Sequence, residues 1–475
     1  MSECVLHVAS HTVLKRHHTR MHVIYCDLLT TPSTIMLAVP LLAAAALGSP
    51  DVDHHLKGIR FGEAAVAAAR SPDTVMKLHM MSDKGLKHNG AVCLDGTDAG
   101  FYYAPASDAS KNASWQLYFQ GGGWCYDKVD CFGRSNSRLG SSKTWSPTVS
   151  AGGIMSDNCD INPDFCNFHR VYMPYCDGDS FSGNREEAVV VKGKPLYFRG
   201  HRVLRAVLDT LVRDHGLGTA KEVLLTGCSA GGLSTFRHAD YVHATVKAAA
   251  PGLQTFKAAP ISGFFLDHDT VDGQRVYAAE MANIFNLANS SGGVNAACIA
   301  ATPRSEAWRC NFAEKAYEFT STPIMPLNSA ADCWQTSCIL TSSLPAAFPN
   351  QTDIGNGVCT SAPGWQNCSC YGCDVEKCTS KQVATLNGYI GDFGAIMEHK
   401  ATYTKPGNGA FIHSCHTHCE AQDDHAYTTF AVGGVTIQQA VSKWWASSLD
   451  TPAAANSYQA CTYSTKSPYK CNPTC

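Results

Sequence analysis

The sequence is poor in charged residues and has no long basic run. Asp, Glu, Lys and Arg make up 16% of its 475 residues, below the roughly one quarter that is usual in soluble domains. With a formal net charge of −3, we expect neither nucleic acid nor an anionic membrane surface as a partner. Hydrophobic residues make up 45%, which is enough for a large core and argues against a disordered chain.

Cysteine, by contrast, is abundant. The chain has 23 cysteines, far more than a reduced cytosolic enzyme usually carries, so we expect an oxidising compartment in which disulfides persist. Cys4 and Cys26 lie in an N-terminal leader, and the number that remains is odd. At least one thiol beyond the leader is therefore expected to stay unpaired.

The N-terminal segment has the pattern of a secretory signal. Its apolar run, from Ile35 to Leu47, is shorter than the ~20 residues of a membrane-spanning helix. The run ends in Ala46-Leu47-Gly48, a pattern of small residues that suits signal peptidase. We expect residues 1–48 to be a cleaved signal peptide or leader, with a signal anchor or a translation start at Met21 or Met36 as the alternatives. No other stretch has the pattern of a membrane span.

Glycosylation sequons agree with secretion, although each is common by chance. They begin at Asn112, Asn289, Asn350 and Asn367. Together with the leader and the cysteines, they predict a secreted glycoprotein.

The pattern of apolar residues predicts an α/β fold. The clearest amphipathic helix spans residues 199–215, and a buried strand at 222–226 follows it. A sharp glycine turn at 227–232 then leads into a second helix from about Leu233. We expect one catalytic domain over residues 75–475. Within it, we interpret the Cys-rich residues 339–383 as an insertion or lid that disulfides hold in place. Further strands are predicted at 115–120, 170–175, 323–327 and 410–412.

The glycine turn contains a candidate nucleophile, Ser229. A Gly-x-Ser-x-Gly sequence between a buried strand and a helix places the serine on a strained, tight turn, where its neighbours two residues away must be small. Here both are glycine, Gly227 and Gly231. Cys228 lies beside the serine and is our candidate for the unpaired thiol.

A glycine-rich segment upstream is a candidate oxyanion hole. The tetrahedral intermediate of ester hydrolysis carries a negative oxygen, which needs preorganised N–H donors. Gly121-Gly122-Gly123-Trp124 follows the predicted strand 115–120, and glycine lets the backbone approach a substrate closely. We expect the donors to be the backbone N–H groups of Gly123 and Trp124, together with that of Ala230 after the serine.

A serine nucleophile needs a histidine base and an acid that orients it. In α/β-hydrolases these follow in the order serine, acid, histidine. The best late segment for the base is Cys415–Cys419. Spacing alone leaves open His416 and His418 within it, and His413 just before it. Asp332 follows the predicted strand 323–327 and is our candidate for the acid. Its rivals are Asp267, Asp269 and Asp272.

A zinc site competes with this interpretation of the late histidines. The histidines and cysteines of 413–419, and the cysteines of 368–378, have spacings that occur in zinc sites. In an oxidising compartment we expect these thiols to form disulfides instead, so we predict no metal and no cofactor.

Several blocks in order along the chain resemble the pectin acetylesterase family, which also includes the animal Wnt-deacylating enzyme Notum. The resemblance extends from about Val75 to Cys475 and is closest to the plant-type members. The blocks are Ala91–Gly96, Gly121–Cys125, Tyr175–Gly178, Ser180–Gly183, Leu196–Gly200, Gly227–Leu233, Gly263–Asp267, Asn328–Gln335 and Cys415–Cys419.

The resemblance implies an α/β-hydrolase fold and metal-free ester hydrolysis. By its alignment Ser229 is the nucleophile, Asp332 the acid and His418 the base, while Gly123, Trp124 and Ala230 supply the oxyanion donors. The chain departs from the plant pattern in its extra histidines, His413 and His416, in the Cys-rich region 336–380, and in the segment 304–318, which is hard to align.

The expected function is that of a secreted carboxylesterase, extracellular or in the cell wall, that removes acetyl groups from pectin. The resemblance gives acetylated polysaccharide as its substrate, and we expect the enzyme to be a monomer without a stable membrane partner. The alternatives are a Notum-like protein lipid deacylase and a catalytically silent carbohydrate-binding homologue.

Overall fold

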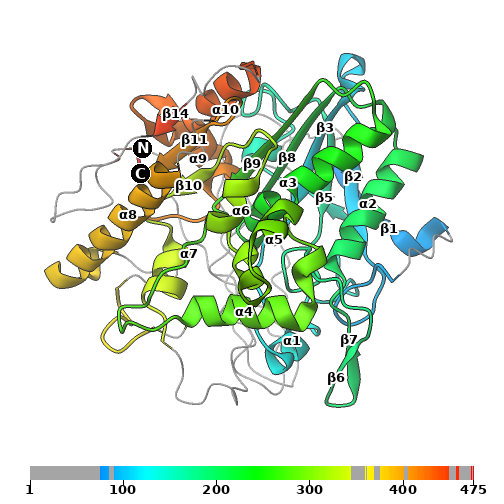
Figure 1. Ribbon diagram of the computed structural model, residues 1–475. Helices are drawn as coiled ribbons and strands as arrows, with labels where there is room; N and C mark the ends of the chain where they lie inside the picture. Colours follow the sequence, from blue (N-terminus) through cyan, green and yellow to red (C-terminus); the bar gives the residue numbers. More distant parts are fainter. Residues whose placement is uncertain are drawn as a thin grey trace, which may run out of the picture. The chain divides into compact units, whose positions relative to one another are not determined.

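A ten-stranded sheet runs through the residues that the computed structural model describes (Figure 1). These residues are 75–84, 90–343, 359, 361–368, 375–400, 405–448, 456–458, 472, 474 and 475. They belong to a unit that spans Ala64–Cys475. The predicted leader at 1–48, the sequon at Asn350 and parts of the insertion at 339–383 lie outside the described residues.

Most of the large sheet is parallel. Its strand order is β14-β11-β10-β9-β8-β3-β5-β2-β1-β4. The pairs from β14 to β5 are parallel, and β2, β1 and β4 are added antiparallel at the other edge. The strands of this sheet are β1 Met76–Met80, β2 Gly100–Ala104, β3 Ser114–Phe119, β4 Thr148–Val149, β5 His169–Met173, β8 Glu222–Cys228, β9 Thr255–Ile261, β10 Leu327–Ser329, β11 Ala410–His413 and β14 Asn456–Tyr458.

Two small hairpins lie outside this sheet. They are β6 Val189–Val191 with β7 Lys194–Leu196, and β12 Ala431–Val432 with β13 Val435–Thr436. The helices are α1 Lys128–Arg134, α2 Gly200–Asp214, α3 Ala230–Ala249, α4 Val276–Ala288, α5 Ala296–Ala301, α6 Ala313–Phe319, α7 Cys333–Gln335, α8 Ser380–Lys400, α9 Asp424–Thr429 and α10 Ile437–Ala446.

The mostly parallel α/β fold is confirmed, with small differences at the ends of elements. The predicted strand at 323–327 begins later, as β10 at Leu327, and Ile324 makes only an isolated bridge. Pro323 and Pro326 explain the delay, because proline has no N–H to donate to a neighbouring strand. The helix predicted from about Leu233 begins earlier, at Ala230.

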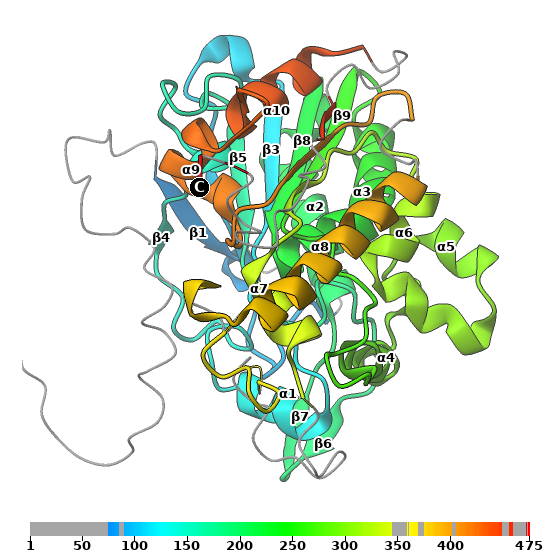
Figure 2. The ribbon, with the colours of Figure 1, turned by 90° about the vertical axis from the view of Figure 1, so that its left-hand side faces the viewer.

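Helices cover both faces of the sheet, and side chains alternate between two cores. On β3, the side chains of Leu117 and Phe119 belong to the core that α3 covers with Phe236. Tyr118, between them, belongs to the core that α10 covers with Trp444. Figure 2 shows α9 and α10 on one side of the central strands and α3 and α6 on the other. This two-sided burial is typical of a parallel sheet and explains the continuous apolar sequence of β8.

Eight disulfides join cysteines of the described residues, which agrees with the expected oxidising compartment. Within the described part of the chain, Cys333 is the free cysteine. The pairs are Cys93–Cys176, Cys125–Cys131, Cys159–Cys166, Cys228–Cys419, Cys298–Cys310, Cys338–Cys359, Cys368–Cys378 and Cys415–Cys475.

The prediction that Cys228 is the unpaired thiol is wrong. Cys228 ends β8 and pairs with Cys419, which lies 191 residues later in the sequence. Cys419 lies in the segment after β11, and this segment comes back to the end of β8. There the two Cα atoms are 5.7 Å apart, a separation that suits a disulfide.

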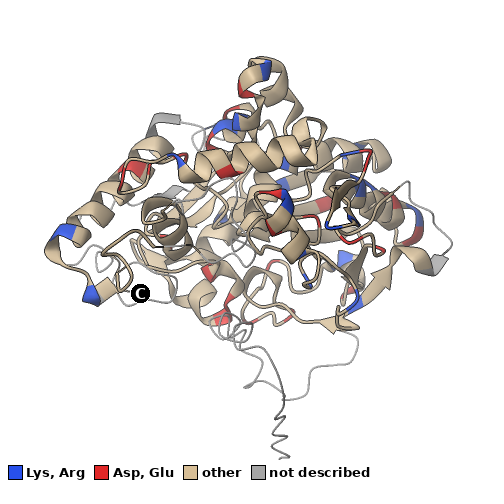
Figure 3. Cartoon of the chain, turned by 90° about the horizontal axis from the view of Figure 1, so that it is seen from below, with Lys and Arg blue, Asp and Glu red and all other residues tan. Residues whose placement is uncertain are grey.

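Charges are spread thinly over the fold, with both signs interspersed (Figure 3). Of the helices that the structure describes, none combines the length and the apolar composition that crossing a membrane requires.

Candidate active site

The candidate nucleophile lies on a strained turn between β8 and α3. Ser229 has φ 61 and ψ −126, a left-handed φ that non-glycine residues seldom adopt. Two backbone hydrogen bonds hold this conformation: the N–H of Ser229 donates to Ile261 at 3.0 Å, and its carbonyl accepts from Leu233 at 2.9 Å. The side chain is 8% exposed. The turn therefore presents the hydroxyl at the end of the sheet at which parallel α/β folds bind ligands.

Glycines are required around this turn because the backbone is crowded. A Cβ on Gly227 would lie 2.5 Å from the carbonyl oxygen of Gly231, and one on Gly231 would lie 2.1 Å from that of Phe119. A Cβ on Gly121 would come within 2.8 Å of the Ser229 Cβ. The prediction that the neighbours of Ser229 must be small is confirmed, and the same crowding places the glycine-rich loop against the serine.

The structure brings Asp332 and His418 together. The Nδ1–H of His418 donates to Oδ2 of Asp332 at 2.7 Å, and the carboxylate is fully buried. Its other oxygen accepts the backbone N–H of Gln335 at 3.0 Å, so the carboxylate is fixed from two sides. Among the described residues, Nε2 of His418 is buried without a hydrogen-bond partner. This histidine is oriented by an acid and has a lone pair free to accept a proton, which is the arrangement of a general base.

The other candidate histidines are engaged elsewhere. Nε2 of His413 is 2.8 Å from Glu420 and its Nδ1 accepts from the N–H of Cys415. His416 contacts the hydroxyl of Thr336 at 3.2 Å, and burial lowers its pKa. The geometry thus supports His418, which the resemblance also selected.

The rival acids do not approach this histidine. Asp267 pairs with Arg275 and Arg309, and Asp269 also pairs with Arg275. Asp272 is exposed. Asp332 is the candidate acid that contacts a histidine of the late loop.

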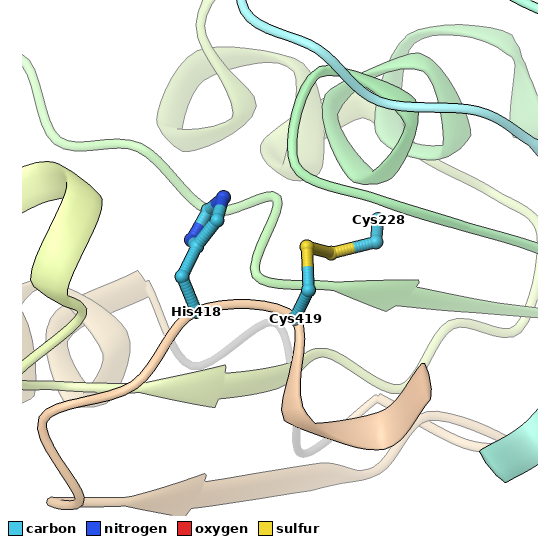
Figure 4. Close-up of side chains that lie close together, drawn as sticks. All are labelled: Cys228, His418 and Cys419. Carbon is cyan, nitrogen blue, oxygen red and sulfur yellow. A yellow bond between two sulfur atoms is a disulfide. The ribbon is translucent and has the colours of Figure 1, made fainter. Parts of the chain in front are cut away.

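A disulfide ties the serine turn to the histidine loop. Cys228 precedes Ser229, and Cys419 follows His418. A disulfide joins Cys228 to Cys419 (Figure 4). One ring nitrogen of His418 lies within 4.8 Å of both sulfurs, so the candidate base lies beside the residue that precedes the candidate nucleophile. This bond, with Cys415–Cys475 and Cys368–Cys378, pairs four of the cysteines that the zinc interpretation named. Two others, Cys370 and Cys373, lie outside the described residues.

Replacing both Cys228 and Cys419 with alanine should impair stability and catalysis together. Because the bond closes a loop of 191 residues, its loss should cost roughly 5 kcal/mol of unfolding free energy. The Tm measured by calorimetry should therefore fall by on the order of 10 °C. Well below that Tm, kcat should still be reduced, because the serine and the histidine are no longer fixed relative to each other.

The matched control for this variant is removal of Cys298–Cys310. That bond closes a loop of only 12 residues, and it joins neither the Ser229 turn nor the His418 loop. Its loss should cost about 3 kcal/mol of unfolding free energy and leave kcat unchanged. A Cys228→Ala/Cys419→Ala protein with wild-type kcat at low temperature would show that this bond does not position the site.

The glycine-rich loop after β3 turns its N–H groups in one direction. The guanidinium of Arg134 donates to the carbonyl oxygens of Gly122 at 2.9 Å and of Gly123 at 3.5 Å. In a trans peptide the N–H points opposite to the C=O. The N–H groups of Gly123 and Trp124 therefore point away from Arg134, and within the described residues neither makes a hydrogen bond. Such free N–H donors are what an oxyanion hole needs.

Ser180 links this loop to the nucleophile turn. Its hydroxyl accepts the indole N–H of Trp124 at 2.7 Å and donates to the carbonyl oxygen of Ala230 at 2.8 Å. Its own N–H donates to the Tyr175 hydroxyl at 2.9 Å. Ser180 and Phe181 both have positive φ values, 49 and 58, which marks a strained segment that the surrounding contacts hold in place.

The sequence carries no local sign of the roles of Ser180 and Arg134. Ser180 contacts residues 50 and 56 positions away in the sequence, and only the resemblance draws attention to it, as part of the block Ser180–Gly183. Arg134 contacts the glycine-rich loop 10 to 12 positions before it. We infer that both are positioning residues for the oxyanion hole.

Ser180→Ala should lower kcat by about tenfold with little change in KM. Loss of the hydroxyl frees Trp124 and Ala230 to shift. The rate should therefore fall, but by less than it falls when one oxyanion donor is removed entirely. Ser234→Ala is the control, because Ser234 also donates to Ala230 but does not contact Trp124. If Ser180→Ala raised KM and left kcat unchanged, the proposed role of Ser180 would be wrong.

Comparisons with known proteins can now be set beside this geometry. The family model described as Pectinacetylesterase matches residues 69–475. Pectin acetylesterase 5 of Arabidopsis thaliana is 30% identical over 409 residues, which cover 85% of this chain and 86% of that protein. Pectin acetylesterase 4 of the same plant is 31% identical over 371 residues, which cover 76% and 81%.

Animal relatives match this chain in sequence over a shorter part of its length than the plant proteins do, but one of them matches it in fold over most of its length. A palmitoleoyl-protein carboxylesterase NOTUM of Schmidtea mediterranea is 33% identical over 178 residues, which cover 37% of this chain and 33% of that protein. The solved structure of the Wnt deacylase Notum from Drosophila is similar with a TM-score of 0.63 and 22% identity, covering 84% of this chain and 99% of that one. At this identity, the similarity to the Drosophila structure shows a shared fold.

Proposed function

The chain belongs to the pectinacetylesterase family, and from this premise we propose that it is a secreted serine esterase that removes acetyl groups from a cell-wall polysaccharide such as pectin. Ester hydrolysis is the activity of the family. The observation that carries the proposal is the His418–Asp332 pair, in which Nε2 of His418 has no hydrogen-bond partner among the described residues. One ring nitrogen of His418 lies within 4.8 Å of the sulfur of Cys228, the residue that precedes Ser229. The disulfides and the predicted leader support secretion.

The proposed mechanism uses residues of this chain alone. The Ser229 hydroxyl attacks the ester carbonyl while its proton passes to Nε2 of His418, and Asp332 stabilises the resulting imidazolium. The N–H groups of Gly123, Trp124 and Ala230 stabilise the oxyanion. His418 then gives its proton to the departing sugar oxygen, which leaves an acetylated Ser229. Water, deprotonated by His418, releases acetate and restores the serine.

Aromatic packing beside the base favours a short acyl group. The rings of Trp124 and Phe265 are 5.0 Å apart, and Phe265 packs against Trp334 at 5.1 Å. The ring centroid of Phe265 is 6.3 Å from that of His418, and Trp124 and Phe265 are buried. Because these rings fill the space next to the histidine, we propose acetyl as the acyl group, in preference to a long lipid chain.

Product analysis on a panel of esters tests this function. The panel contains acetylated pectin, acetylated xylan and a long-chain acylated peptide, and the released acid is identified. We expect acetate from acetylated pectin and no release from the acylated peptide, with Ser229→Ala as the blank. Cleavage of only the long-chain ester would instead support a lipid deacylase, and absence of turnover on every ester would support a silent binding protein.

A further inference from the structure

A polar cavity of about 530 Å³ lies at the N-terminal part of α2, apart from the triad residues. Three arginines line it, and they are spaced three residues apart along the chain: Arg199, Arg202 and Arg205. At this spacing the side chains lie on one broad face of a helix. His201, Asn184 and Glu186 complete most of the lining.

Positive charge in this cavity exceeds negative charge. Among the described residues that line the cavity, Glu186 is the acidic one, and it pairs with Arg202 at 2.5 Å. Arg199 donates to the carbonyl oxygens of Glu186 and Gly90, and it shares the single negative charge of the Glu186 side chain with Arg202. Arg205 is exposed, and among the described residues its guanidinium has no ion pair or hydrogen bond. At least two of the three guanidinium charges thus remain available to an anion.

His201 adds a neutral polar group. Burial, together with the charge of Arg205, lowers the pKa of His201 to about 4, so the ring is uncharged at neutral pH. Its Nδ1 is buried and has no hydrogen-bond partner within the described residues. An unsatisfied buried nitrogen is costly.

One short loop connects the cavity to the candidate active site. Ser180 contacts Trp124 and Ala230, and Asn184, four residues later, lines the cavity. Four residues span at most about 14 Å. The Cα atoms of Ser180 and Asn184 are therefore separated by no more than the length of a few sugar units.

We propose that this cavity binds carboxylate groups of an acidic polysaccharide chain while an acetyl ester of the same chain lies at Ser229. Guanidinium groups suit carboxylates because their planar N–H pairs match the two oxygens. This inference rests on the proposed function, and it assigns to Arg199, Arg202 and Arg205 the selection of acidic over neutral polymers.

Kinetics of Arg205→Ala test the proposal. Because Arg205 is exposed, its loss should leave the fold intact. KM for acetylated polygalacturonate should rise about threefold to fivefold, as expected when one exposed charge pair is lost, with kcat unchanged. KM for a neutral acetylated glucan should stay the same, and the salt dependence of KM for the acidic polymer should weaken.

Arg213→Ala is the matched control, since Arg213 lies on the same helix but pairs with Asp214 outside the cavity. It should behave like the wild type on both polymers. An equal KM for Arg205→Ala and the wild type on the acidic polymer would overturn the proposal, as would an equal rise on the neutral polymer.

A binding measurement separates this inference from the proposed function. Ser229→Ala protein is titrated with polygalacturonate that carries no acetyl groups, with and without the second substitution Arg205→Ala. We expect affinity to fall about threefold to fivefold in the double variant. If the wild type hydrolyses no acetylated polymer, the proposed function fails, but this titration still tests the cavity. Equal affinity of the two proteins would overturn the carboxylate site whatever the hydrolysis result.

Discussion

Ser229→Ala is expected to lower kcat for acetyl ester hydrolysis on the order of 10⁶-fold, the loss seen when the serine of a comparable triad is removed. The reason is chemical: without the hydroxyl no acyl-enzyme forms, and only the oxyanion donors and substrate binding remain. Stopped assays of acetate release from acetylated pectin measure the residual rate. The Tm should stay close to that of the wild type, because the Ser229 side chain makes no hydrogen bond among the described residues.

A pair of histidine variants is the control for this experiment. His418→Ala should lose activity about as severely as Ser229→Ala, whereas His416→Ala should retain most of it because its ring contacts Thr336. The reverse result would assign the base to His416. Wild-type activity in Ser229→Ala would remove this serine from the mechanism.

Asp332→Asn should lower kcat on the order of 10⁴-fold, as replacement of the orienting aspartate does in a serine protease triad. It should also move the pH profile. Burial alone would lower the pKa of His418, but the charge of Asp332 and its hydrogen bond outweigh burial, so the pKa lies above its ordinary 6.5. The base must be neutral to act, so the wild-type rate should fall as the pH drops through that raised value.

In the Asp332→Asn protein only burial and the more distant Glu420 remain to set this pKa. The acid limb of the residual activity should therefore shift to lower pH, which a profile of kcat/KM measures. Asp269→Asn, at a rival carboxylate that pairs with Arg275, is the control and should leave both rate and profile unchanged. An unshifted acid limb in Asp332→Asn would mean that His418 is not the titrating base.

Local patterns determined the part of the site that lies within one continuous segment. Strand, Gly-Cys-Ser-Ala-Gly turn and helix follow one another within about thirty residues, so Ser229 could be predicted from sequence, and the tight backbone around Gly227 and Gly231 is the physical reason. The α/β fold was predictable for the same reason, because apolar periodicity is a short-range signal.

Contacts between distant segments were decided only by the tertiary structure. Which histidine meets Asp332 depends on how β10 and β11 pair, and spacing alone left three candidates open. Cys228 was assigned wrongly because its partner is 191 residues away, and sequence does not encode pairing over such a distance. Ser180 likewise contacts Trp124 and Ala230, which are 56 and 50 residues away in the sequence. The sequence by itself thus determined the candidate nucleophile and the fold class, while the candidate base, its disulfide anchor and the charged cavity follow from folding.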